Sequence, residues 1–290
     1  MKVIYMLTDR CNANCIHCYK RGATRIARDL SRCKEDVAKM TAQGHQMIVA
    51  GAEILTNLDY LQVYALAGQK YLLTNGILLS QDVNLPHKLI ACGIEEVCIS
   101  WHIGSGDILS SISDDVIETA IYNCLKAGLK AKVSCVLCNR NYNLLANEIV
   151  PRVQTTGVNA LRLFQLMPVR AELKQYQLTA AQKEEVLRVV KQLREFFNKF
   201  VFRIEVQGSF GATKLTEKRR LASRNGLFCP AGKTLVVVET DNQVYPCPFL
   251  TQSQFRMGYW ENGQLNIERK FSNDGTCCVA EKLLCRNETQ

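Results

Sequence analysis

Three cysteines stand close together near the start of the chain, in the segment Cys11-Asn12-Ala13-Asn14-Cys15-Ile16-His17-Cys18. Thiolates are the usual ligands of iron–sulfur clusters and of structural zinc ions. A fully ligated four-iron cluster takes four thiolates, so three on one loop leave one iron with an open position that a chelating small molecule can occupy. The spacing C-x3-C-x2-C therefore predicts a reactive metal cluster. A zinc site completed by a fourth ligand from elsewhere is the alternative.

The cysteine content of the whole chain points the same way. The chain has 14 cysteines among 290 residues and opens with no export signal. Because the cytosol is reducing, this content favours metal ligation or redox chemistry over disulfides. With 47% hydrophobic and 22% charged residues and no apolar run of the ~18 residues that a membrane span needs, we expect a soluble cytoplasmic protein without a membrane partner.

The charge pattern bears on possible partners. The formal net charge is +9, but the basic residues are scattered and no stripe interleaves them with aromatic residues. Proteins that bind single-stranded nucleic acid combine a basic groove with such aromatic residues. We therefore do not expect a nucleic-acid partner.

The first two thirds of the chain alternate short apolar runs with amphipathic stretches. The expected strands are Val3–Leu7, Gln46–Ala50, Lys70–Thr74, Glu96–Trp101, Ala131–Leu137 and Ala160–Leu166. The expected helices are Ser31–Thr41, Leu58–Ala67, Leu85–Cys92, Asp115–Ala127, Leu144–Thr155 and Ala180–Asn198. Six strand–helix units predict an α/β fold, a partial (β/α)6 TIM-like barrel, with a doubly wound sheet as the alternative. The triplet then follows the first strand, at the end where barrel enzymes place their active sites.

After residue 200 the composition changes. Phe200–Val206 is one more possible strand, and Thr234–Glu239 and Gln243–Tyr245 read as two strands joined at Asp241-Asn242. Five cysteines lie here, namely Cys229, Cys247, Cys277, Cys278 and Cys285. A segment this small has little hydrophobic core of its own, which favours stabilisation by metal. We predict a barrel domain over residues 1–208 and a small cysteine-rich iron–sulfur domain over 209–290.

The triplet, followed by the aromatic residue Tyr19, resembles the signature of the radical S-adenosylmethionine superfamily. In that family the open iron binds the amino and carboxylate groups of S-adenosylmethionine. The reduced cluster cleaves the sulfonium to methionine and a 5′-deoxyadenosyl radical, which abstracts hydrogen from the substrate. The resemblance implies that Cys11, Cys15 and Cys18 hold a 4Fe-4S cluster and that Tyr19 lies near the adenine.

The resemblance extends over residues 3–170 through weaker motifs at the ends of later strands. Ala50-Gly51-Ala52-Glu53-Ile54 stands where the family has Gly-Gly-Glu-Pro, with two departures, and Thr74-Asn75-Gly76 follows the third strand. Ser100 ends the fourth strand, although His102 departs from the usual pattern. The cofactor-binding residues that the resemblance implies are Tyr19, Gly51, Ala52, Glu53, Asn75, Ser100 and Leu166.

The C-terminal segment is similar to the twitch and SPASM domains that carry auxiliary iron–sulfur clusters in peptide-modifying radical enzymes. It has a cysteine, a hairpin and a second cysteine after Val244-Tyr245-Pro246, with Asn242 where the family has glycine. It has too few cysteines for two clusters, so the resemblance implies one auxiliary 4Fe-4S cluster. The implied ligands are Cys229, Cys247, Cys278 and Cys285. Spacing does not decide between Cys277 and Cys278, and a four-cysteine zinc site is the alternative.

The resemblance implies an enzyme that cleaves S-adenosylmethionine and modifies a peptide or protein by crosslinking, thioether formation, epimerisation or oxidation. The substrate binds directly or through a separate recognition protein, and an electron donor such as flavodoxin or ferredoxin reduces the cluster. The alternatives are radical dehydrogenation of a small-molecule alcohol and a non-enzymatic zinc or iron–sulfur interaction module. Cys98 and Cys135 lie on strands expected to line the barrel and are candidate catalytic hydrogen donors.

Overall fold

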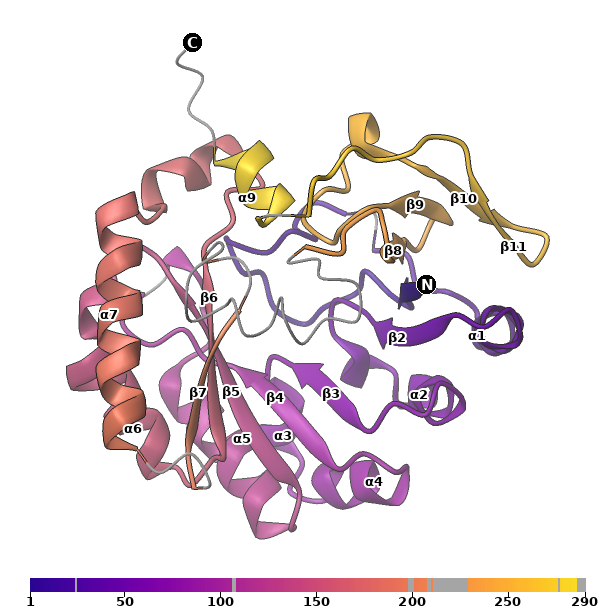
Figure 1. Ribbon diagram of the computed structural model, residues 1–290. Coiled ribbons are helices and arrows are strands. Elements are labelled where there is room, and N and C mark those ends of the chain that lie inside the picture. Colours follow the sequence, from indigo (N-terminus) through magenta and orange to yellow (C-terminus); the bar gives the residue numbers. More distant parts are fainter. Residues whose placement is uncertain are drawn as a thin grey trace.

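A partial barrel of parallel strands forms most of the molecule (Figure 1). The computed structural model describes residues 1–23, 25–105, 108–197, 201–207, 210, 229–275 and 277–285. The barrel strands are β1 (Lys2–Met6), β2 (Gln46–Ala50), β3 (Tyr71–Thr74), β4 (Glu96–Ser100), β5 (Lys130–Leu137), β6 (Ala160–Gln165) and β7 (Arg203–Val206). Every hydrogen-bonded pair among them is parallel. The expected barrel and its first six strands are confirmed, and the seventh is a shorter strand within the expected range.

Helices cover the outer face of the curved sheet (Figure 1). They are α1 (Leu30–Ala42), α2 (Leu61–Leu66), α3 (Ile77–Gln81), α4 (Leu85–Ala91), α5 (Asp114–Lys126), α6 (Val150–Thr155) and α7 (Ala180–Phe196). Short helical turns join them: η1 (Ile54–Thr56), η2 (Leu58–Tyr60), η4 (Tyr142–Leu144), η5 (Leu145–Ile149) and η6 (Ala171–Tyr176). Thr179 begins α7 with a reciprocal capping box to Gln182, as its residue type predicts. The sequence did not reveal α3, and α5 begins after Ser113.

The two faces of the β3–β7 sheet differ sharply. Partners in register on parallel strands point to the same side, so Val97, Val133 and Leu161 share the face that packs against the helices in the main core. The opposite, inner face carries polar side chains, listed here by strand: Glu96, Cys98 and Ser100 of β4, Lys132 and Ser134 of β5, Arg162 of β6 and Glu205 of β7. Buried parallel strands are ordinarily apolar on both faces. The polar inner face shows that the barrel interior is not simply packed core.

One side chain bridges a break in the sheet. Backbone pairing stops between β2 and β3, so the strands fall into a six-stranded and a five-stranded sheet. The carboxamide of Gln69 accepts a hydrogen bond from the Val49 N–H (2.8 Å) and donates to the Val49 carbonyl (3.0 Å). These bonds satisfy the backbone N–H and C=O of Val49, which a neighbouring strand would otherwise pair. The same carboxamide donates to the Tyr71 carbonyl (3.1 Å) and so links the two sheets.

The C-terminal segment extends the barrel sheet. Its strands are β8 (Leu235–Val238), β9 (Gln243–Tyr245), β10 (Gly258–Glu261) and β11 (Gln264–Ile267), with η8 (Ser253–Phe255) and α9 (Val279–Leu284). β8 pairs in parallel with β1, and β9 to β11 follow as an antiparallel meander (Figure 1). The two expected strands are confirmed, and Asn242 adopts a positive φ of 69° at their turn. The predicted boundary between residues 208 and 209 lies outside the described residues and stays a prediction.

Among the described residues, no helix has the length and apolar character that crossing a membrane requires.

Candidate active site

The cysteine triplet forms a loop directly after β1, at the C-terminal end of the barrel strands. The backbone N–H of Ala13 donates to Cys11 Sγ (3.4 Å), and that of Lys20 donates to Cys18 Sγ (3.4 Å). Burial raises the pKa of the Cys11 thiol, an effect that the Ala13 N–H opposes. N–H groups aimed at sulfur stabilise thiolates and tune the clusters that thiolates bind. The loop is therefore built to hold negatively charged sulfur.

All three thiols line one cavity of about 70 Å3, together with Ala52. Each cysteine is half-buried, so its sulfur is accessible from this cavity rather than sealed in the core. Convergence of three thiols on one space fits a cluster ligated at three corners. Within the described ranges, no three His, Cys, Asp or Glu side chains lie close enough together to hold a single metal ion. The ligands of a four-iron cluster bind separate irons and therefore lie farther apart than the ligands of one ion.

Three other elements hold the triplet loop. Asn75, after β3, donates from Nδ2 to Cys11 Sγ (3.6 Å) and to Asn12 Oδ1 (2.7 Å). Cys15 Sγ lies 3.7 Å from the Ser110 hydroxyl.

The Arg170 guanidinium, beyond β6, donates to the carbonyls of Cys18 (2.9 Å) and Ile16. Sequence reasoning identified Asn75 but missed Ser110 and Arg170, because neither belongs to a motif and only the fold brings them to the loop.

The segment after β2 closes the other side of the cavity. A Cβ on Gly51 would lie 2.7 Å from Ile54 Cδ1 and 2.9 Å from Thr8 Cγ2, so a larger residue here would force these side chains at the ends of β1 and β2 to shift. The Ala52 N–H donates to the Thr8 carbonyl (2.8 Å) and sets the residue against the thiols.

Glu53 is directed into the protein. It is buried, and its carboxylate accepts hydrogen bonds from the N–H of Leu55 (3.2 Å), the hydroxyl of Thr74 (3.0 Å) and the N–H of Asn75 (2.7 Å). Burial raises the Glu53 pKa against these bonds. In this arrangement Glu53 orders the ends of β2 and β3. Its role toward a ligand stays a prediction.

Tyr19 and Leu166 are two of the residues implied to bind the cofactor. Tyr19 packs edge-on against Phe249 of the C-terminal segment, with ring centroids 5.8 Å apart, and burial raises its pKa. Leu166 packs with Leu109 and Cys138 in a small cluster at the ends of β5 and β6. Tyr19 thus joins the triplet loop to the C-terminal segment, while Leu166 is buried just after β6.

A buried ionic cluster lies beside the triplet. Lys20 Nζ is 2.8 Å from Asp9 Oδ1 and also pairs with Glu239, in the turn after β8. The three side chains are only 9%, 5% and 7% exposed. The Thr240 hydroxyl donates to Asp9, and the Arg28 guanidinium donates to the Glu239 carbonyl. The cluster therefore ties the triplet loop to the C-terminal strands with groups that have left water.

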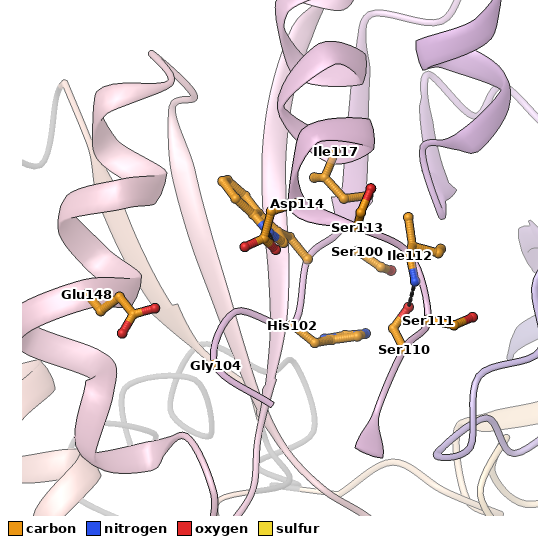
Figure 2. A pocket seen from close by; sticks show the side chains of 11 residues that line it. Ser100, His102, Gly104, Ser110, Ser111, Ile112, Ser113, Asp114, Ile117 and Glu148 are labelled. Carbon is orange, nitrogen blue, oxygen red and sulfur yellow. Dashed lines mark hydrogen bonds between the residues drawn. The ribbon is translucent and has the colours of Figure 1, made fainter. Parts of the chain in front are cut away.

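Ser100 lines a polar cavity of about 430 Å3 beyond β4 (Figure 2). Its hydroxyl lies 3.4 Å from that of Ser134 on the inner face. His102 lines the same cavity, accepts the Val136 N–H on Nδ1 (3.1 Å) and meets His17 edge-on, with centroids 4.6 Å apart. Burial lowers the His102 pKa well below its usual value, so the ring is neutral. Because Ser110 lines this cavity and also contacts Cys15, the space adjoins the triplet.

The two candidate hydrogen donors lie on opposite faces of the sheet. Cys98 is on the inner face, where Arg162 and Lys132 oppose the rise in its pKa that burial causes. Cys135 packs in the main core between sheet and helices, and burial raises its pKa to about 12. Of the pair, Cys98 is the one on the face that encloses the barrel interior.

The C-terminal cysteines gather in part. Cys229, Cys247 and Cys278 pack against the same small apolar cluster, and burial raises the pKa of Cys247 and Cys278 to about 12. Cys285 instead has Lys183 and Glu281 as neighbours. The structure thus groups three of the four predicted auxiliary ligands and places Cys278, rather than Cys277, among them.

Comparisons with known proteins agree with this arrangement, although the chain matches no family model. It is 26% identical over 302 residues to the mycofactocin maturase MftC of Mycolicibacterium smegmatis, covering 94% of this chain and 73% of that protein. Streptococcus suis SuiB bound to precursor peptide SuiA has a similar fold, with a TM-score of 0.67 at 15% identity, over 89% of this chain and 62% of that one. Native anSMEcpe with bound AdoMet and the Cp18Cys peptide gives 0.63 at 18% identity, over 89% and 77%.

The fold is the partial TIM-like barrel with a C-terminal extension that these structures share. The triplet after β1 and the motifs at the later strand ends resemble those of the radical S-adenosylmethionine superfamily, and the chain is similar to MftC over nearly its whole length. The cofactors of this class are a 4Fe-4S cluster and S-adenosylmethionine. The chain spans less than two thirds of the length of SuiB.

Proposed function

We propose that the protein cleaves S-adenosylmethionine reductively and uses the resulting 5′-deoxyadenosyl radical to abstract hydrogen from a peptide or protein substrate during its maturation. The observation that carries the proposal is the convergence of Cys11, Cys15 and Cys18 on one cavity at the active end of the barrel. The likeness to a named maturase over 94% of the chain supports a peptide substrate rather than a small alcohol.

The bound cluster and S-adenosylmethionine would supply the electron transfer and the radical. The protein's own residues hold the three thiols, through Asn75 on Cys11, Ser110 on Cys15 and Arg170 on the carbonyls flanking His17. Ala52, on the cavity wall, leaves room for a ligand beside the thiols. Ser100 offers a hydroxyl in the adjoining polar cavity for the ribose or the carboxylate.

The inner face of the barrel supplies the surface for the substrate. Lys132 pairs with Glu96 (2.6 Å) and Arg162 with Glu205 (3.2 Å), and all four side chains are partly exposed. Charged pairs that keep contact with water can exchange partners with a polar ligand at modest cost. This lining suits the backbone and polar side chains of a peptide segment.

The finer points of the proposal concern partners and place. A one-electron donor such as flavodoxin or ferredoxin reduces the cluster, and the peptide binds directly or through a separate recognition protein. An auxiliary cluster lies among the C-terminal cysteines. The number of unpaired thiols supports a reducing compartment, the cytoplasm.

Anaerobic reconstitution with iron and sulfide, followed by dithionite and S-adenosylmethionine, tests the activity. We expect 5′-deoxyadenosine from the native protein, none from Cys15→Ala, and native amounts from Cys92→Ala, which removes an exposed thiol outside the site. Failure of the native protein to release 5′-deoxyadenosine would refute the proposal.

The peptide substrate is tested with short peptides encoded beside the gene, by mass spectrometry for a mass change that depends on S-adenosylmethionine. Turnover of a small alcohol without any change in a peptide would favour the dehydrogenase alternative.

A further inference from the structure

Two cations lie on neighbouring strands of the inner barrel face, with short side chains beside them. The register places Ser134 of β5 beside Arg162 of β6, and therefore Ala160 beside Lys132. These four residues form a square, which we call the cationic square. Its two cations occupy one diagonal, and the two short side chains occupy the other. Neither short side chain is long enough to cover the ammonium or the guanidinium group.

The carboxylates that pair with these cations engage only part of their N–H groups. Lys132 Nζ lies 2.6 Å from Glu96, which also accepts a hydrogen bond from Asn159 Nδ2 (3.1 Å). Arg162 Nε lies 3.2 Å from Glu205. An ammonium carries three N–H groups and a guanidinium carries five, so two such contacts use a minority of them. The cationic square therefore has hydrogen-bond donors for a further carboxylate.

The inner face beside the cationic square is open to solvent. Tyr71 and Leu73 of β3 share this face, because they pair in register with inner-face residues of β4. Their side chains are 40% and 51% exposed among the described residues, although both are large and apolar. The two cations are themselves partly exposed, and ion pairs that keep contact with water exchange partners at modest cost. A ligand can therefore reach both cations.

A row of hydroxyl groups connects the cationic square to the triplet. Ser134 lies in register with Ser100 of β4, and their hydroxyls are 3.4 Å apart. Ser100 lines the polar cavity of Figure 2 together with Ser110, whose hydroxyl contacts Cys15. Arg162 lies two strands from Ser100, which is about 10 Å. That distance is spanned by about three residues of an extended peptide.

We propose that Lys132 and Arg162 bind a carboxylate of the peptide substrate and so select substrates that carry one about three residues from the group held in the polar cavity. The carboxylate is that of an acidic side chain or of the peptide C-terminus. It accepts hydrogen bonds from both cations, and the planar guanidinium can engage both of its oxygens. This inference rests on the proposed function for the peptide nature of the substrate.

A reporter thiol tests the carboxylate site without any substrate. Ser134→Cys places a thiol beside Arg162, and iodoacetate and iodoacetamide are alkylating reagents of similar size that differ by a carboxylate. Mass spectrometry of peptides from the reconstituted protein gives the two alkylation rates at residue 134. Adding Arg162→Gln should lower the ratio of the iodoacetate rate to the iodoacetamide rate about tenfold. The control is Arg188→Gln, because Arg188 pairs with Glu185 on the surface of α7 and should leave the ratio unchanged.

The alkylation experiment also separates binding from a purely structural role. If the two cations only brace the barrel, Arg162→Gln lowers Tm but leaves the rate ratio unchanged, and that result would overturn the proposal. A thiol at residue 134 that neither reagent alkylates would overturn it as well, because the site would then be closed to ligands. Lys132→Gln should lower the ratio in the same direction, so the test does not depend on the folding of one variant.

The role in substrate selection is tested with a peptide that the native enzyme modifies. Each acidic residue of the peptide is replaced by its amide, and a separate peptide has an amidated C-terminus, which distinguishes the two sources of a carboxylate. One of these changes should raise KM about tenfold for the native enzyme and have little effect on Arg162→Gln. Equal effects on both enzymes would refute the proposal and leave the peptide-modifying function standing. Failure to modify any peptide would refute that function, whereas the alkylation rates would still decide whether the cationic square binds a carboxylate.

Discussion

Replacing Lys20 by methionine should destabilise the protein well beyond an ordinary lysine substitution. Lys20 is 9% exposed and lies between the carboxylates of Asp9 and Glu239, which are 5% and 7% exposed. Removing one member of a buried ion pair leaves uncompensated charge and costs about 3–5 kcal/mol. In a protein of this size each kcal/mol lowers Tm by about 2–4 °C, so we expect a fall of about 6–20 °C.

Thermal unfolding of the anaerobically reconstituted protein, followed by far-ultraviolet circular dichroism, measures this effect. The matched control is Lys39→Met, because Lys39 pairs with Glu35 on the surface, at 44% and 51% exposure, and such pairs contribute little. The deficit of Lys20→Met should persist in 1 M salt, where the Debye length is about 3 Å but buried charges are poorly screened. Equal Tm values for the two variants would refute the argument that the Lys20 cluster is buried.

The pH dependence of the same variant has a definite sign. Burial raises the pKa of Glu239 above its ordinary value, and Lys20 opposes the rise. Without Lys20 that pKa rises further, so the folded chain binds a proton more readily than the unfolded chain. The Tm deficit should therefore be largest at neutral pH and shrink as the pH falls through the folded pKa of Glu239. Adding Glu239→Gln should reduce the deficit at neutral pH.

Three further predictions follow from the site. Arg170→Met removes two charged hydrogen bonds worth about 1.5–3 kcal/mol each and should speed loss of the triplet cluster to a chelator at least tenfold, whereas Arg170→Lys should restore only part of the protection; native rates in both would contradict a clamping role. Glu53→Ala leaves three hydrogen-bond donors unpaired, so in urea unfolding it should lower the free energy of unfolding more than Glu53→Gln does. Because burial raises the Glu53 pKa in the folded protein, the stability that the protonated carboxyl contributes should fall as the pH rises above about 4.3. Glu53→Gln should abolish this pH dependence. Cys98→Ala should alter the product while leaving 5′-deoxyadenosine release intact, and Cys135→Ala should lower only Tm; the reverse result would exclude Cys98 as a hydrogen donor.

Local patterns in the sequence were sufficient for much of the fold. Apolar runs located the first six strands to within one residue, and the amphipathic stretch Ala180–Asn198 located the start of α7. The missed helix α3 has only five residues, too short for a helical repeat to show. The polar inner face of β4 to β7 was missed because buried parallel strands are ordinarily apolar on both faces.

Long-range neighbours could not be predicted in the same way. Spacing identified the triplet, but Arg170 lies 154 residues from the Ile16 carbonyl that it holds, and Lys20 pairs with Glu239 across 219 residues. Nothing in the local sequence indicates that β8 pairs in parallel with β1, because the partner of a strand depends on which sheet edge is free in the folded protein. Family resemblance supplied Cys285 as a ligand, an assignment that stays a prediction; its charged neighbours are Lys183 of α7 and Glu281 of α9.

The pairing of β8 with β1 has a bearing on protein engineering. The triplet follows β1 directly, and Cys247, a predicted auxiliary ligand, follows the hairpin that begins with β8, so the two predicted cofactor sites lie at the ends of neighbouring strands of one sheet. Their separation is then a property of strand geometry and does not vary with the length of a linker. Chimeras that exchange the C-terminal segment between enzymes should succeed only when β8 is matched to its new β1, whatever the junction.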